Sequence, residues 1–248
     1  HVGATLYNDT QLFLGPNPTP DEELRRIQLI AHETAHAWFG NLVTMDWFDD
    51  VWTKEVFANH FSAWITEPLF PSVNHKLQRM RTFFASALSE DRTPGTNAIH
   101  QELDNLRNAG LIYGQIIYNK APVVMGKIIE LMGEDAFREG IREYLRTYAY
   151  SNATWDDLIH ILDRHTPEDL IAFNDAWVNR KGMPIIRFTP RGNTLEIRQK
   201  DRYAPGIVRP QRFAVTLAAE GQTDTTLEVN LRDSLVRLTL PFAPERVL

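Results

Sequence analysis

The chain has 248 residues, of which 43% are hydrophobic and 23% charged, and its formal net charge is −6 at pH 7. A chain of this length can bury a sizeable core in one large or two smaller domains. The acidic balance without a basic cluster argues against nucleic-acid binding. No apolar run approaches the roughly 18 residues that cross a bilayer, and no signal peptide is recognisable. Because cysteine is absent, disulfides and thiolate metal sites are excluded, whereas a soluble location in the cytosol, periplasm or exterior remains open.

The first residues predict extended structure. Residues 2–14 are rich in β-branched and aromatic side chains with loose alternation, which favours one or two strands before the Gly-Pro-Asn-Pro turn at residues 15–18. The chain opens at His1 without an initiator methionine, so we expect it to be a piece of a longer protein.

A helix is predicted from about Pro20 to Phe39. Thr19 or Asp21 can cap its N-terminus, and proline suits the first helical position. Apolar residues recur through the segment at helical spacing, and Gly40 can end the helix.

This helix contains an H-E-x-x-H motif at His32, Glu33 and His36. Positions i and i+4 lie one turn apart on one helix face, so the two imidazoles can bind one tetrahedral Zn²⁺ with a carboxylate as third ligand. Glu33 is then placed to take a proton from water. A second helix, from about residue 50 to a stop at Pro68, can return Glu55 to the histidines. The alternative is a surface helix whose histidines bind nothing, which these surroundings disfavour.

Further helices are predicted downstream from apolar periodicity and capping residues. They span residues 72–89, 100–108, 112–132, 134–148, 154–164 and 167–179. Histidines without metal-ligand spacing, which we interpret as surface or packing residues, are His75, His100, His160 and His165. His60 lies five residues after Glu55 and could hydrogen-bond a metal ligand, but ordinary packing is the favoured interpretation.

The pattern changes to short alternating segments near residue 181. They cover residues 185–188, 195–199, 212–218, 226–231 and 234–240. Such segments, separated by Gly, Asn, Asp or Pro, predict an antiparallel sheet or small sandwich without chemistry of its own. The predicted fold class is therefore α+β, with a mostly helical domain at residues 1–180 and a β-module at residues 181–248.

The stretch HETAHAWFGNLVTMDWFDDVWTKEVFANHF, residues 32–61, resembles the zinc aminopeptidases of the aminopeptidase N type, a gluzincin family that includes leukotriene hydrolase. The resemblance continues through residues 118–162 and 177–186 into the β-module, so it covers nearly the whole chain. It implies a thermolysin-like catalytic domain followed by a small antiparallel β-sandwich.

The resemblance also implies roles for single residues. His32, His36 and Glu55 match the ligands of one Zn²⁺, Glu33 matches the general base, and Tyr118 matches the tyrosine that stabilises the oxyanion. On the residues alone, Tyr118 would be a packing aromatic near a helix start. Lys120 either supports the site or faces solvent, and the residues do not decide between these.

Three features depart from the family pattern. Lys54-Glu55-Val56 stands where the family has Asn-Glu-Gly, and Lys120-Ala121-Pro122 where it has Lys-Gly. The amine-binding G-x-M-E-N segment would precede His1, so the group that defines an exopeptidase is not in view. We expect the N-terminal and C-terminal domains of the parent protein to pack against this chain.

The expected function is zinc-dependent hydrolysis of N-terminal residues from peptides. Peptides are the expected substrates, and no nucleic acid or membrane segment is expected. One alternative is a catalytically impaired scaffold or binding module in which the motif survives as structure. Another is the same site used for a different hydrolysis, such as that of an epoxide.

Overall fold

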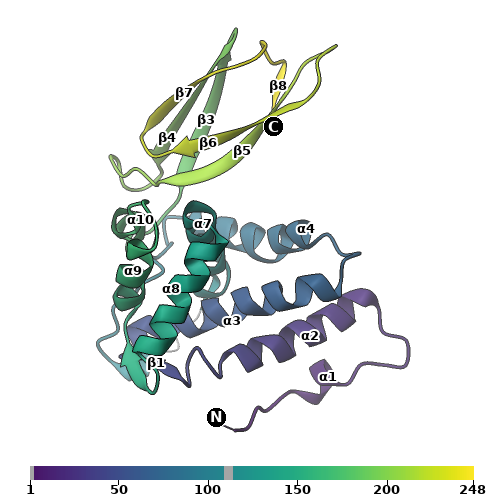
Figure 1. Cartoon of the computed structure of the whole chain (residues 1–248), viewed down its shortest axis with the longest axis vertical. Coiled ribbons are helices and arrows are strands. Elements are labelled where there is room, and N and C mark those ends of the chain that lie inside the picture. Colours follow the sequence, from purple (N-terminus) through teal and green to yellow (C-terminus); the bar gives the residue numbers. More distant parts are fainter. Residues whose placement is uncertain (1–2, 109–113) are drawn as a thin grey trace.

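The structure, a computed structural model, describes residues 3–108 and 114–248. A layer of helices forms the N-terminal part, and two small sheets lie above it at the C-terminal end (Figure 1). The chain is thus an α+β protein, as predicted. Its apolar residues form two clusters, one among the helices and one within the β-module; the domain boundary at residue 180 stays a prediction.

The helices are defined as follows in chain order. The α-helices are α1 (Asp9–Leu12), α2 (Pro20–Ala35), α3 (Val51–Thr66), α4 (His75–Arg79), α5 (Ala85–Asp91), α7 (Ala121–Met132), α8 (Glu134–Thr147), α9 (Trp155–Arg164) and α10 (Leu170–Trp177). The 3₁₀ turns are η1 (Phe48–Asp50), η2 (Glu67–Leu69) and η4 (Leu106–Asn108), and the π-helical turns are η3 (Met80–Phe84) and η5 (Ile116–Lys120). In the described part of the chain, every helix is too short or too polar to span a membrane.

Capping boxes begin two of the helices where the sequence predicts a start. At α2, the Thr19 hydroxyl accepts from the Glu22 N–H, and the Glu22 carboxylate accepts from the Thr19 N–H at 2.8 Å. Thr154 and Asp157 repeat the arrangement at α9. Each box satisfies backbone donors that the first helical turn leaves free, which fixes where the helix begins.

The prediction of strands in residues 2–14 is wrong for the residues that the structure describes. The side chain of Asn8 accepts from the Thr10 N–H at 3.0 Å and caps the short helix α1. Leu6 and Phe13 are 87% and 74% exposed. A strand needs a hydrogen-bonded neighbour, and in the described chain this segment has none, so a local Asn-capped turn prevails.

The predicted helix at residues 100–108 is also wrong apart from the turn η4. The backbone N–H groups of Ile99 and His100 both donate to the Val178 carbonyl, at 3.0 and 3.1 Å. These two hydrogen bonds to the residue after α10 hold the start of the segment outside any helix. The helix predicted at residues 112–132 begins outside the described residues, and its described part consists of η5 followed by α7.

The helical core forms where α3, α7, α9 and α10 meet. Trp52 of α3 packs against Trp155 of α9 with ring centroids 4.5 Å apart, and both are almost fully buried. A parallel strand pair that sequence patterns did not predict, β1 (Val43–Met45) and β2 (Ser151–Ala153), closes the edge of this core. The pair joins the segment after α2 to the segment before α9.

The β-module consists of two antiparallel three-stranded sheets. One has the order β3 (Pro184–Arg191), β4 (Thr194–Asp201), β7 (Leu235–Thr239), and the other has the order β6 (Thr225–Leu231), β5 (Gln211–Ala218), β8 (Arg246–Val247). The sequence predicted all of these strands except β8. Alternate residues of β4, among them Leu195 and Ile197, are buried in the module's core, as expected for a sheet with one solvated face.

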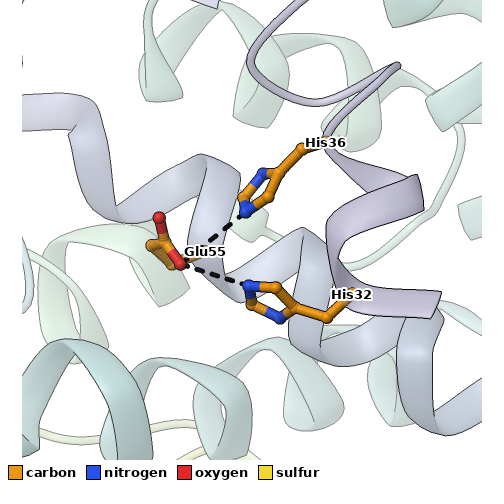
Figure 2. Close-up of side chains that lie close together, drawn as sticks. All are labelled: His32, His36 and Glu55. Atoms are coloured by element: carbon orange, nitrogen blue, oxygen red, sulfur yellow. Dashed lines mark ion pairs between the residues drawn. The ribbon is translucent and has the colours of Figure 1, made fainter. Parts of the chain in front are cut away.

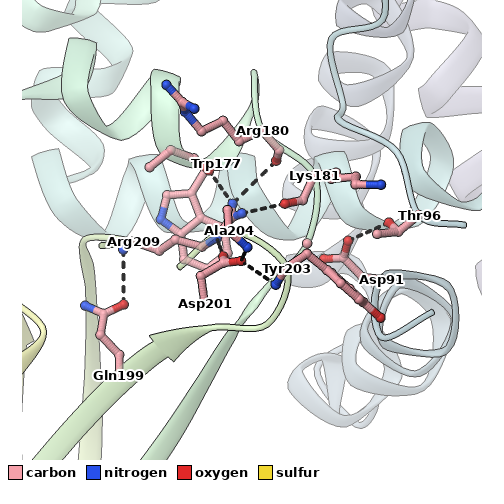
Figure 3. Close-up of polar contacts among 12 residues, drawn as sticks. Asp91, Thr96, Trp177, Arg180, Lys181, Gln199, Asp201, Tyr203, Ala204 and Arg209 are labelled. Carbon is pink, nitrogen blue, oxygen red and sulfur yellow. Dashed lines mark hydrogen bonds and ion pairs between the residues drawn. The ribbon is translucent and has the colours of Figure 1, made fainter. Parts of the chain in front are cut away.

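A buried ion pair joins the β-module to the helices. Arg209 and Asp201 have fully buried side chains, with Nε 2.6 Å from Oδ2 (Figure 3). The Arg209 guanidinium also donates to the carbonyls of Ala176 and Lys181, at the end of α10 and beyond it. Its cation lies 5.5 Å from the ring centre of Trp177. This charge pair therefore contributes to the junction through the hydrogen bonds of Arg209 to backbone carbonyls of the helical part.

Candidate metal centre

The candidate metal centre lies between α2 and α3, which run side by side in the lower helical layer (Figure 1). Figure 2 shows His32, His36 and Glu55 pointing toward one another from these two helices. Nε2 of His32 is 3.4 Å from Oε2 of Glu55, and Nε2 of His36 is 3.9 Å from the same oxygen. The three residues predicted as metal ligands therefore meet at one point.

These distances suit a tetrahedral zinc ion. Zinc binds imidazole nitrogen and carboxylate oxygen at about 2.0–2.1 Å, so neighbouring ligand atoms in a tetrahedron lie about 3.3–3.4 Å apart. All three donor atoms fall within 4.8 Å of one another. A small inward movement of His36 completes the geometry, and two nitrogens with one oxygen form a donor set that zinc favours.

Hydrogen bonds at the far side of each ring fix the tautomer of both histidines. Nδ1 of His32 lies 3.0 Å from Oδ1 of Asn59, and Nδ1 of His36 lies 3.1 Å from the Phe39 carbonyl. Because both partners are acceptors, each Nδ1 must donate, and the lone pair of each neutral ring is on Nε2, toward Glu55. Sequence reasoning missed Asn59; its place one turn after Glu55 on α3 was the available signal.

The end of α2 is shaped to hold His36. The helix stops at Ala35, earlier than predicted, so His36 is the C-cap residue, although its N–H still donates to the His32 carbonyl. Gly40 has a φ of +120°, which favours glycine. A Cβ there would lie 3.5 Å from Cδ of Lys54. This turn directs the Phe39 carbonyl at the His36 ring.

The Glu55 carboxylate is held in its charged form. Burial acts to raise its pKa, but the hydrogen bond that the His32 ring donates when protonated, and the positive charges of Lys54 and of a protonated His36, outweigh burial and leave the pKa below its ordinary value. Nζ of Lys54 is 3.7 Å from Oε1 of Glu55. Glu55 is thus a carboxylate ready to bind a cation.

A cavity of about 610 Å³ opens beside His32, one of the three candidate ligands. His32 and Glu33 of α2 and Asn59 of α3 line it, together with residues of α1 and η3. Glu33 is half-buried there. The cavity gives a molecule a place to lie against one candidate ligand, His32, and against the carboxylate predicted as the base, Glu33.

Tyr118 and Lys120 lie on η5, which packs against α3. The Tyr118 side chain is 39% exposed, and its predicted role stays a prediction. Lys120 is 3% exposed and does not face solvent. Its ammonium group binds Asp91 and the Gly182 carbonyl. Nothing in the sequence pattern linked these segments.

The remaining histidines have ordinary partners. His160 and His75 contact backbone carbonyls, and His165 lies 2.7 Å from Glu143. Asp49, Asp50 and His100 form a second group of potential ligands among the described residues. There, however, the buried Asp50 accepts from the Trp155 N–H at 3.0 Å and helps begin α9, which is a structural use.

His60 packs as an aromatic residue, which confirms the favoured interpretation. Its ring contacts those of Phe61 and Phe137 edge-on, with centroids 5.2 and 5.7 Å away. Burial, aided by the charge of Arg79, lowers the pKa of His60 from 6.5 to about 4. The native state therefore holds this ring neutral.

The free energy of unfolding is expected to fall as the pH drops from 6.5 to 4. In this window the unfolded chain binds a proton at His60 that the native state does not, which costs about 1–3 kcal/mol of stability. Urea unfolding of chelator-treated protein, at several pH values, measures the slope. In His60→Gln the slope should be smaller; equal slopes in the two proteins would contradict the assignment.

Comparison with known proteins adds an independent observation. The Peptidase family M1 domain profile matches residues 1–177. Leucyl aminopeptidase of Saccharolobus solfataricus is 29% identical over 236 residues, which are 94% of this chain and 30% of that protein. Aminopeptidase N of Lactococcus lactis subsp. lactis is 30% identical over 205 residues, which are 80% of this chain and 24% of that protein. The chain spans less than a third of the length of these relatives.

Proposed function

Because the chain belongs to peptidase family M1, we propose that it is the catalytic segment of a zinc-dependent aminopeptidase with a thermolysin-like helical domain. The observation that carries this proposal is the convergence of His32 Nε2, His36 Nε2 and Glu55 Oε2 beside a cavity that Glu33 also lines. The three side chains would hold one Zn²⁺. A bound zinc supplies Lewis-acid polarisation of the scissile carbonyl and a lowered pKa for water.

The residues around the proposed zinc site transfer the protons and stabilise the developing charge. Glu33 takes a proton from the attacking water as a general base and passes it to the departing amine. Tyr118 donates a hydrogen bond to the oxyanion that develops on the carbonyl oxygen. Asn59 and the Phe39 carbonyl keep the two histidine rings in the orientation that leaves Nε2 free.

Cleavage at the N-terminus requires a group that binds the substrate's α-amine. Such cleavage is supported by the similar proteins described above, which are a leucyl aminopeptidase and an aminopeptidase N. We propose that this group and further domains belong to the longer protein and pack against the segment. The natural substrates are then peptides with a free N-terminus.

His36→Ala is expected to remove both zinc and activity. The full-length protein should contain one zinc per chain by elemental analysis and hydrolyse an aminoacyl p-nitroanilide. The variant keeps only two protein ligands, so zinc should fall below about a tenth of an equivalent after dialysis, because three ligands are the usual minimum for a catalytic site.

The matched control is His160→Ala, which removes an exposed histidine from α9 and should retain zinc. Stoichiometric zinc in His36→Ala would refute its role as a ligand. Equal cleavage of an N-acetylated substrate would refute the aminopeptidase assignment while leaving the metal centre intact.

A further inference from the structure

Lys120 is the last residue of the turn η5, and each of the three N–H donors of its ammonium group has an acceptor. Its Nζ lies 3.0 and 2.9 Å from the two carboxylate oxygens of Asp91 and donates to the Gly182 carbonyl at 2.9 Å. An ammonium group has three donors, and this site offers three acceptors. The side chain is therefore confined to a single arrangement inside the protein.

The two residues that accept from Lys120 are held in place by further contacts, Asp91 in the helical part and Gly182 in the β-module. Asp91 ends α5 and accepts a hydrogen bond from the Thr96 hydroxyl at 2.8 Å (Figure 3). Gly182 lies in the β-module with a φ of +95°, and a Cβ there would meet the Tyr203 ring at 3.1 Å. The Tyr203 hydroxyl in turn donates to the Arg92 carbonyl. The helical part and the β-module thus meet at the Lys120 ammonium group.

The same turn presents Tyr118 two residues earlier. Ile116, Ile117 and Lys120 are buried, whereas Tyr118 is 39% exposed. The turn is π-helical, a wide geometry that is uncommon and recurs at functional sites. Since an α-helical turn would rotate each side chain differently about the axis, the direction of Tyr118 depends on what keeps the turn wide and anchored.

We propose that Lys120 is a positioning residue for the Tyr118 hydroxyl, and that the β-module supports catalysis through it. Asp91 and the Gly182 carbonyl anchor the inner side of η5, which orients the exposed side. This inference rests on the proposed function, because it requires that Tyr118 contact the oxyanion. An oxyanion donor acts only within a few tenths of an ångström of its productive position.

Lys120→Met is expected to lower kcat of the full-length, zinc-loaded enzyme by roughly 10- to 100-fold while KM changes less than about twofold. Methionine fills similar volume but offers no donor. Removing a contact that matters only in the transition state lowers kcat without weakening substrate binding. A rise in KM with unchanged kcat would overturn the proposal.

A double-mutant cycle with Tyr118→Phe gives the decisive readout. If Lys120 acts through the Tyr118 hydroxyl, Lys120→Met should cost less than about threefold in kcat once that hydroxyl is gone. Effects that multiply in the double variant would overturn the inference and leave the proposed function standing. A Tyr118→Phe enzyme with native kcat would overturn both the oxyanion assignment and the positioning role.

Two further variants separate positioning from stability. Asp91→Asn in the Lys120→Met background removes the stranded buried charge, so thermal stability should recover while kcat stays low; recovery of both would overturn the proposal. The matched control is Lys127→Met. Lys127 is a partly buried lysine, which reaches from α7 to the Trp177 ring and Gln211. The Lys127→Met substitution should lower thermal stability without lowering kcat.

Discussion

Glu33→Gln is expected to lower kcat for peptide-amide hydrolysis by about 10²–10⁴ while the protein retains one zinc per chain. Glutamine has nearly the shape of glutamate but cannot accept the proton of the attacking water. The proposed metal ligands His32, His36 and Glu55 are untouched, so zinc content should stay stoichiometric. Steady-state kinetics with parallel elemental analysis measures both quantities on the same preparation.

The matched control is Glu23→Gln, which removes the same charge from the first turn of α2, far from the ligands on that helix. Its kcat should stay within roughly twofold of the native value, because more than two turns of α2 separate Glu23 from His32. A fully active, zinc-replete Glu33→Gln protein would eliminate Glu33 as the base and require another group in the cavity.

Arg209→Met is expected to cost about 3–5 kcal/mol of unfolding free energy, because it leaves Asp201 buried without its partner. Both side chains are completely buried, and Asp201 also accepts from the N–H groups of Tyr203 and Ala204, so it cannot turn to solvent without losing both hydrogen bonds. The guanidinium's hydrogen bonds to the end of α10 are lost as well. Urea denaturation monitored by tryptophan fluorescence reports the change.

The contrasting variant is Arg237→Met, whose exposed side chain pairs with Glu196 at 3.1 Å on the surface of the β-module. Its unfolding free energy should be nearly unchanged, since water replaces the lost contact. Equal effects of the two substitutions would show that burial of the Arg209 pair has no special weight in joining the β-module to the helices.

The meeting of the three candidate ligands could be predicted from sequence because it follows local rules. The helical spacing of His32 and His36 is a property of one segment, and Glu55 lies on a second predicted helix, α3, which ends before Pro68. Strand alternation predicted the segments of the β-module in the same way. Capping residues such as Thr19 gave helix starts to within one residue.

What could not be predicted depends on contacts between distant segments. Lys120 binds residues 29 positions before it and 62 after it, and no periodic pattern encodes such a meeting. The π-helical turn η5 carries the same apolar spacing as an ordinary helix, so sequence favours the commoner geometry. The prediction for the first residues was wrong for the converse reason. Their β-branched and aromatic composition predicts a strand, but no strand pairs with this segment among the residues that the structure describes.

The parallel pairing of β1 with β2 has a consequence for biosynthesis. Val43 pairs with Ser151, and Asn152 donates to the Met45 carbonyl across 107 positions. A ribosome-bound chain whose helix α2 has just emerged still lacks β2. It also lacks Trp155, against which Trp52 of α3 packs. Such non-local contacts form slowly because a long loop must close first. The two helices that hold the metal centre therefore reach their final arrangement only after the chain beyond residue 155 has emerged, and a nascent chain truncated earlier should bind zinc weakly.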